Sequence, residues 1–252
     1  MRPLYGKNKK RIWELDALRG LAVLLMLLDH LTFDLAEISY YFSDWANAGG
    51  FMRTLERWGT AFQNSALRAG GHYVFVVVFL LLVGISCTFS HSNVKRGLQV
   101  LGCGFAVTIV TRFLVIMGAL DARVGPIVWG ILQVIGFSIL LYAAIAAVTG
   151  NRYVLLGAGA AILLAGILID WTNVTQAAPL PQGLTRWQEI GWFVRNDLAQ
   201  VMWGLKWYGP DCFGILPCTG VVLIGGYIGK TFYRDRKSLL PRLDGAWNRP
   251  FR

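Results

Sequence analysis

The stretch of the chain from Val124 to Asn151 contains no lysine, arginine, aspartate or glutamate. An apolar run of this length is typical of a helix that crosses a lipid bilayer. Hydropathy patterning predicts six spans, over residues 15–38, 72–92, 96–118, 125–149, 153–171 and 212–232. The chain is 55% hydrophobic and only 15% charged, which excludes an ordinary soluble domain. We therefore predict an all-α fold, a polytopic bundle of transmembrane helices.

Lysine and arginine lie mainly between and beyond these segments, which predicts the orientation of the chain. With a cytosolic N-terminus, the inside segments hold 15 of the 24 basic residues and the outside segments hold seven. The positive-inside rule then places both ends in the cytoplasm. We expect basic cytoplasmic tails over residues 1–12 and 233–252, around a membrane domain over 13–232. The net charge of +10 is thus first a topology signal, so we expect membrane lipids and no nucleic acid as partners.

Two predicted outer segments, residues 39–71 and 173–210, are rich in tryptophan and phenylalanine. Both resemble interfacial helices lying on the outer leaflet. Their aromatic rings could stack a sugar, but an aromatic belt at the membrane surface is the simpler explanation. Residues 189–207 could instead form a seventh, partial span. The four cysteines lack the spacing of zinc or redox pairs, so no metal site is expected.

Between Leu15 and Asp34, the first predicted span is interrupted by five ionisable residues. Four of them fall within an arc of about 60° on a helical projection, and Asp29 points elsewhere. The four are Asp16, Arg19, His30 and Asp34. Because ionisable groups at membrane depth avoid lipid, this stripe should face the bundle interior or a watered cavity. The alternative is a structural ladder of salt bridges, Asp16 with Arg19 and His30 with Asp34.

His30 is the candidate catalytic base of this helix. Histidine titrates in the range needed to take a proton from an incoming amine or hydroxyl. Asp34, one turn further on, could orient the ring and stabilise its charged form. Arg19 lies about 16 Å from His30 along the axis, toward the cytosolic end. The same His–Asp pair could relay protons in a transporter, so the residue types alone do not identify the reaction.

Several motifs together carry a family resemblance. Residues 11–22 read RIWELDALRGLA and are followed by Asp29-His30 and Asp34, by VGISCTFS over residues 83–90, by Lys95-Arg96-Gly97 and by GILQ over residues 130–133. From residue 11 to about 232, the chain resembles the heparan-alpha-glucosaminide N-acetyltransferase catalytic-domain family, most closely its short bacterial members. The opening motif is also similar to the wider transmembrane acyltransferase superfamily. The resemblance implies an enzyme that moves an acetyl group from cytosolic acetyl-CoA to the amino group of an extracytoplasmic amino sugar such as glucosamine. It also implies an integral protein of a bacterial inner membrane.

The resemblance also suggests roles for individual residues. His30 would be the general base with Asp34 as its partner, and Asp16 with Arg19 would organise the cytosolic mouth for acetyl-CoA. The basic residues Lys9, Lys10 and Arg11 could attract the CoA phosphates, although anionic lipid is a simpler partner for them.

Two further residues keep two interpretations each. His72, at the outer start of the second predicted span, is the alternative base or else an interfacial histidine. Gln133, a lone amide in an apolar span, either forms a hydrogen bond between two helices or donates one to the thioester carbonyl.

Other functions remain open at this point. The acceptor could be a hydroxyl group, which would make the protein a sugar O-acyltransferase. A non-enzymatic protein is the rival, either a small proton-coupled transporter or a structural membrane bundle. The sequence shows no repeat of the kind that inverted-repeat transporters carry. The oligomeric state also stays open, with a homo-oligomer among the alternatives.

Overall fold

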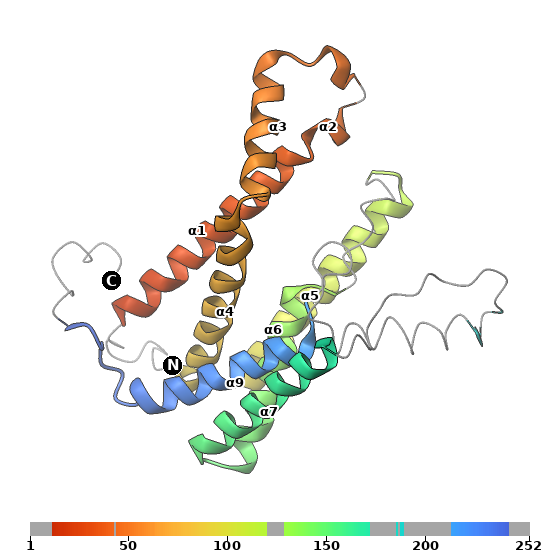
Figure 1. Cartoon of the computed structure of the whole chain (residues 1–252). Coiled ribbons are helices and arrows are strands. Elements are labelled where there is room, and N and C mark those ends of the chain that lie inside the picture. The colour runs from red at the N-terminus through yellow and green to blue at the C-terminus, as the bar shows by residue number, and fades with distance from the viewer. Residues whose placement is uncertain are drawn as a thin grey trace, which may run out of the picture. The chain divides into compact units, whose positions relative to one another are not determined.

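The computed structural model describes most of the chain as helix (Figure 1). The described residues are 12–42, 44–119, 129–171, 185, 187–188 and 213–241, and over them no strand occurs. Lys9, Lys10 and Arg11 lie outside these ranges, as does nearly all of the outer segment 173–210, including the proposed seventh span. The chain forms two compact units, Met1–Phe79 with Asp235–Arg252, and Leu80–Arg234.

The first unit is built around the polar first helix. Its elements are α1 (Trp13–Ala36), α2 (Ile38–Tyr41), the short 3-10 helix η1 (Trp45–Asn47), α3 (Gly50–Gln63) and the first part of α4 (Ala66–Phe89). α3 runs antiparallel beside the last turns of α1, because Gly59 meets the backbone at Ala36 while Gln63, four residues later, reaches Thr32 and Asp29. A Cβ atom at Gly59 would lie 2.7 Å from the Ala36 nitrogen, so only glycine permits this approach. One face of α3 packs against α1, and the predicted interfacial position of this segment stays a prediction.

The second unit contains the apolar helices. It comprises the end of α4, α5 (Asn93–Ile116), α6 (Ile131–Val148), α7 (Arg152–Trp171) and α9 (Ile215–Phe232), with α5 packed on α6 and α9 packed on both α6 and α7. Backbones touch at small residues: a Cβ at Gly84 of α4 would collide with the Val222 carbonyl oxygen of α9. A buried hydrogen bond of 2.9 Å between the hydroxyls of Ser138 and Thr219 also joins α6 to α9.

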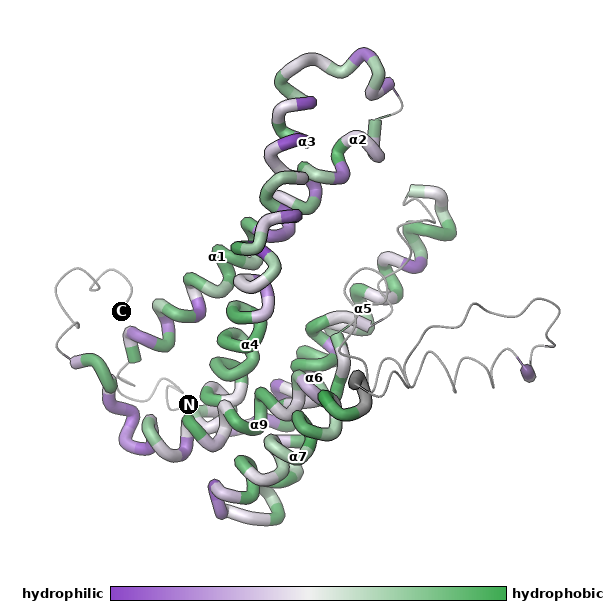
Figure 2. Tube along the Cα trace, viewed as in Figure 1, coloured by the Kyte–Doolittle hydropathy of each residue, from purple (hydrophilic) through white to green (hydrophobic). Residues whose placement is uncertain are grey.

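All six predicted spans are helices, displaced by a few residues at their ends. Among the described residues, α4, α5, α6 and α9 are long and apolar enough to cross a membrane, and α7 contains a shorter apolar stretch, Arg152–Leu168. Figure 2 shows the hydrophobic colouring of these helices and the hydrophilic interruptions on α1 and α3. The number of spans and the orientation of the ends stay predictions.

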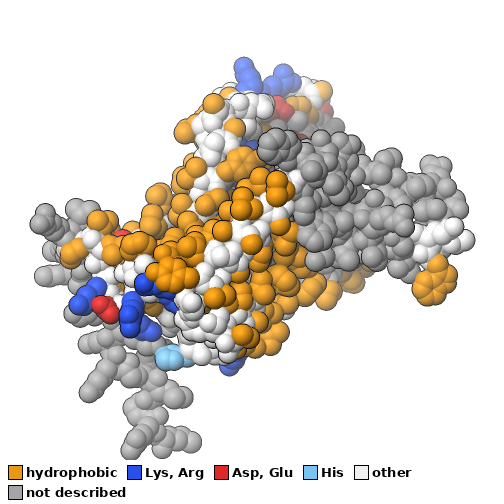
Figure 3. All heavy atoms as spheres, turned by 60° about the horizontal axis from the view of Figure 1, so that its bottom comes forward, with side chains coloured by type: hydrophobic (Ala, Val, Ile, Leu, Met, Phe, Trp, Pro, Cys, Tyr) orange, Lys and Arg blue, Asp and Glu red, His pale blue; other side chains and the backbone are white. Residues whose placement is uncertain are grey.

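Hydrophobic side chains dominate the visible surface of the helices (Figure 3). On α5, for example, Ile109, Phe113 and Ile116 are all exposed. A soluble protein seldom exposes so much contiguous apolar area, whereas helices that face lipid do. The composition argument for a membrane protein is therefore supported by the positions of the side chains.

Candidate active site

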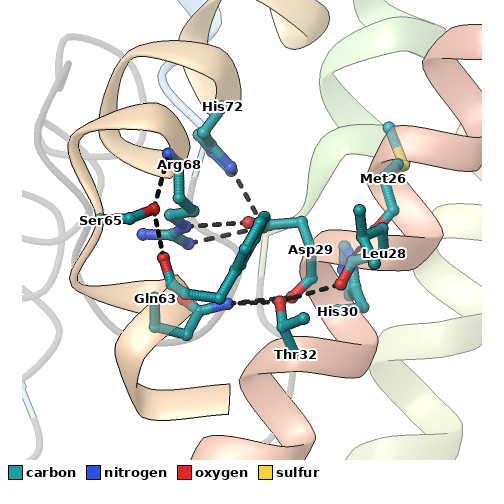
Figure 4. A network of polar contacts seen from close by, with 10 residues as sticks. Met26, Leu28, Asp29, His30, Thr32, Gln63, Ser65, Arg68 and His72 are labelled. Atoms are coloured by element: carbon teal, nitrogen blue, oxygen red, sulfur yellow. Dashed lines mark hydrogen bonds and ion pairs between the residues drawn. The ribbon is translucent and has the colours of Figure 1, made fainter. Parts of the chain in front are cut away.

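The carboxylate of Asp29 is buried on α1, and it is shared by two side chains of α4 (Figure 4). Arg68 donates from Nε to Oδ1 at 2.8 Å and from Nη2 to Oδ2 at 3.4 Å. His72 lies 3.2 Å from Oδ2 through its Nδ1 atom and is itself buried. An ionised carboxylate only accepts hydrogen bonds, so the Nδ1 atom of His72 carries the hydrogen. We call Asp29, Arg68 and His72 the Asp29 cluster.

A second layer of hydrogen bonds fixes the backbone beneath this cluster. The Gln63 side-chain amide donates to the Thr32 hydroxyl at 2.9 Å and to the Asp29 carbonyl oxygen at 3.1 Å. Thr32 is fully buried, and its hydroxyl donates back to the carbonyls of Leu28 and Asp29. Figure 4 shows these contacts beside the ion pair. The end of α3 is therefore tied to the turn of α1 that carries Asp29.

The local sequence explains why both α4 side chains reach one carboxylate. Ser65 precedes the first residue of α4, and its hydroxyl oxygen accepts the Arg68 backbone N–H at 3.1 Å, which is the usual N-cap contact. Arg68 and His72 are four residues apart and so lie on the same face of the helix, one turn from each other. Among the described residues, the start of α4 thus supplies both side chains that contact the Asp29 carboxylate.

His30 and Asp34 are not brought together. Both side chains are exposed, and His30 uses its Nδ1 atom to donate to the Met26 carbonyl oxygen at 2.8 Å. No hydrogen bond or ion pair joins the two residues in the described part of the chain. The His30 ring still has a defined tautomer, because a carbonyl oxygen can only accept, so Nε2 of the neutral ring is its proton acceptor. Its predicted role as the base stays a prediction.

The predicted pair at the other end of α1 is present. Arg19 Nη1 lies 2.9 Å from Asp16 Oδ1, and both side chains are about one third exposed. The structural ladder is therefore half formed, with this pair present and the His30–Asp34 pair absent. The buried face of α1 is that of Ala22, Asp29 and Thr32, beside the predicted stripe and not on it.

Gln133 makes the contacts of a structural residue. Its amide nitrogen donates to the Gly104 carbonyl oxygen and to the Thr108 hydroxyl, each at 2.9 Å, and its carbonyl oxygen accepts the Gly130 backbone N–H at 3.0 Å. Both amide hydrogens are thus used within the α5–α6 pair. These contacts favour the helix–helix alternative, and binding of a thioester by Gln133 stays a prediction.

Arg68 and Gln63 were not predicted from the sequence as site residues. A signal for Arg68 was present, because it stands four residues before His72 at the start of an apolar helix, the spacing at which two side chains share a partner. Asp29 was the unpaired acid of the first span, and pairing the two would have suggested the cluster. Gln63 offered no comparable signal. Among the described residues, no group of three His, Cys, Asp or Glu side chains is arranged to hold a metal ion.

Comparison with known proteins agrees with this picture of a polar site in a membrane bundle. The family model described as heparan-alpha-glucosaminide N-acetyltransferase, catalytic, matches residues 11–249. No curated protein and no solved structure matches the chain. The family match includes α1, the Asp29 cluster and every other described helix. The chain therefore belongs to the heparan-alpha-glucosaminide N-acetyltransferase catalytic-domain family, a family of membrane acetyltransferases.

Proposed function

We propose that the protein transfers an acetyl group from cytosolic acetyl-CoA to the amino group of an extracytoplasmic amino sugar such as glucosamine, with His72 as the general base. The observation that carries this assignment is the 3.2 Å contact between His72 Nδ1 and the buried carboxylate of Asp29. A base needs a ring of defined tautomer and a group that stabilises its protonated form. Asp29 supplies both to His72.

The transfer is a nucleophilic substitution at the thioester carbonyl. The amine nitrogen attacks the carbonyl carbon, a carbon–nitrogen bond forms, and the carbon–sulfur bond breaks. The proton lost by the amine passes to Nε2 of His72, while the other hydrogen stays on Nδ1 and remains hydrogen-bonded to the Asp29 carboxylate. The leaving CoA sulfur then takes up that proton from Nε2, which regenerates the neutral ring, so that CoA thiol and an acetamido sugar are the products.

The cytosolic end of α1 is the proposed entrance for the donor. Arg19 and Asp29 are ten residues apart, which corresponds to about 15 Å along a helix. The Asp16–Arg19 pair would organise this mouth, and the basic residues Lys9, Lys10 and Arg11 would attract the CoA phosphates, as the sequence suggests. With the predicted orientation, the Asp29 cluster then lies toward the outer surface, where the amino sugar arrives. An integral protein of a bacterial inner membrane fits this arrangement.

His30 is the competing base, and its exposed ring favours access by a substrate. It differs from His72 in having a neutral carbonyl as its partner and no contact with a carboxylate in the described residues. A carbonyl stabilises an imidazolium less than a buried carboxylate does. This difference, together with the burial of Asp29, is the reason for preferring His72.

The test measures acetyl transfer by the full-length protein in lipid nanodiscs, with acetyl-CoA and glucosamine. His72→Asn removes the base while its amide can still donate to Asp29, so we expect kcat to fall by about 10²–10⁴-fold with the protein still folded. His30→Asn should change kcat by less than about tenfold, and His91→Asn, in the exposed turn between α4 and α5, serves as the control.

Three outcomes would contradict the proposal. Absence of transfer to glucosamine would refute the amino-sugar acceptor, and acetylation of glucose in its place would indicate O-transfer. An active His72→Asn protein beside an inactive His30→Asn protein would move the base to His30 and support its pairing with Asp34.

A further inference from the structure

Asp29 serves two groups of different character. Arg68 is a permanent cation, and it contacts both carboxylate oxygens through one edge of its guanidinium group. His72 can be neutral or charged, and it contacts only Oδ2. The single negative charge of Asp29 therefore faces the permanent positive charge of Arg68. It also faces His72, which is positively charged only when its ring is protonated.

Counting charges shows what this sharing does to His72. With Arg68 and Asp29 both ionised, the cluster is neutral when His72 is neutral and carries one positive charge when His72 is protonated. Without Arg68, the same protonation would turn a lone buried carboxylate into a neutral ion pair. Burial disfavours net charge, so the first arrangement favours the neutral ring and the second favours the imidazolium.

The surroundings of the cluster add little competing charge. Side-chain exposure is 10% for Asp29 and 28% for Arg68, so water screens the pair only in part. α3 contacts the cluster through the uncharged amide of Gln63, while its charged residues Arg53, Glu56 and Arg57 have no described contact with it. On α1, His30 and Asp34 are exposed on other faces, and on α4 the ring of Tyr73 meets the edge of His72. In the contacts that we describe for the cluster, the charged partners are therefore Asp29 and Arg68.

We propose that Arg68 is a positioning residue that keeps His72 in its neutral, proton-accepting form. It does so by neutralising Asp29 while holding the carboxylate against the Nδ1 hydrogen. The inference rests on the proposed function only for its consequence in catalysis, because a base that is already protonated cannot accept the proton of the amine. The protonation state itself is a property of the cluster in the resting protein.

Nitrogen NMR of the imidazole rings tests this directly. The chain has three histidines, so the signals of His72 in the full-length protein in nanodiscs are assigned by their loss in His72→Asn. At pH 7.5, the wild-type protein should show a neutral His72 ring with the hydrogen on Nδ1. Arg68→Gln should convert more than about half of it to the doubly protonated ring, and Arg68→Lys should stay neutral because the charge is retained. Arg57→Gln, an exposed arginine on α3, is the control and should leave the ring unchanged.

Activity supplies a second measurement. At pH 7.5, kcat of Arg68→Gln should fall by at least about twofold, in proportion to the protonated fraction of His72, and recover as the pH is raised, while the KM for acetyl-CoA stays within about twofold of the wild-type value. A merely structural role would lower activity equally at every pH.

Each result decides a separate question. A doubly protonated His72 in the wild-type protein would overturn the inference without any variant, even if Arg68→Gln failed to fold. A neutral ring in a folded Arg68→Gln protein would overturn it as well. An active His72→Asn protein would instead refute His72 as the base. The NMR measurement would still show whether Arg68 controls the protonation state of His72.

Discussion

Replacing Gln133 with leucine distinguishes the two roles that the sequence leaves open for this amide. Leucine has a similar volume and keeps the apolar character of α6, but it makes none of the hydrogen bonds. Gly104 and Thr108 on α5 would lose a donor, and the buried Gly130 N–H would lose its acceptor. The substitution therefore removes the polar link between α5 and α6 at the start of α6.

The size of the effect follows from these three contacts. A protein hydrogen bond contributes about 1 kcal/mol net. Polar contacts between membrane helices average about 0.6 kcal/mol. Three such bonds therefore correspond to a loss of about 2–3 kcal/mol. The orphaned Gly130 N–H sets the upper part of this range, while the Gly104 carbonyl can still accept from the Thr108 hydroxyl.

The assay compares thermal unfolding and acetyl transfer for Gln133→Leu and for Gln99→Leu, which removes an exposed amide from α5. A structural Gln133 predicts a lower midpoint of unfolding for Gln133→Leu alone, with a normal kcat at temperatures where the protein stays folded. A thioester donor predicts the reverse, a stable protein whose kcat falls by about 10²-fold or more. Unchanged stability with lost turnover would therefore refute the structural interpretation.

Two further changes test one contact within each compact unit. Gly84→Ala should destabilise the protein by about 1–3 kcal/mol in the same unfolding assay, because its new methyl group meets the backbone of Val222. Gly102→Ala on α5 is the control: its methyl group meets nothing within 4 Å, so this change should be neutral or mildly stabilising. Glu14→Ala should release the segment that begins at Asp235, because the Glu14 carboxylate accepts the Leu239 N–H at 2.7 Å. Hydrogen exchange of the Leu239 amide should then rise by about fivefold, and unchanged exchange would show that the contact does not hold the segment.

The apolar helices could be predicted from the sequence because lipid imposes one simple rule on them. A membrane span needs a long uncharged stretch, and α6 lies inside the run from Val124 to Asn151. Close packing at small residues was predictable for the same reason. The role of each glycine was not, since Gly159 meets the backbone of α9 whereas Gly157, two residues before it, faces open space.

The position of α3 could not be predicted in the same way. Its amphipathic pattern indicates a helix with one apolar face, and a membrane surface and a neighbouring helix cover such a face equally well. The choice depends on Gly59, whose missing side chain lets the backbone of α1 approach. Nothing in the pattern of α3 alone reveals that partner.

The site was partly predictable, because the period of the helix groups residues by face without showing which face is buried. The projection correctly separated Asp29 from the stripe of Arg19 and His30. The face of α1 that carries Asp29 is the buried one, because α3 and α4 bring Gln63 and Arg68 to it. That information lies in segments about 35–40 residues away and has no trace in the first helix itself.

The distance between the two ends of α1 constrains how the proposed reaction proceeds. One helix carries both the Asp16–Arg19 pair and Asp29, so their separation of about 15 Å is fixed by its backbone. The charged nucleotide part of CoA cannot follow the acetyl group over that distance into an apolar bundle, because burying its phosphates without partners is too costly. The thioester must then reach the Asp29 cluster on the uncharged arm of CoA, or the amino sugar must descend toward the donor. A donor shortened to the arm alone should therefore keep its reactivity at the cluster and lose affinity at the mouth, which would appear as a raised KM with a nearly unchanged kcat.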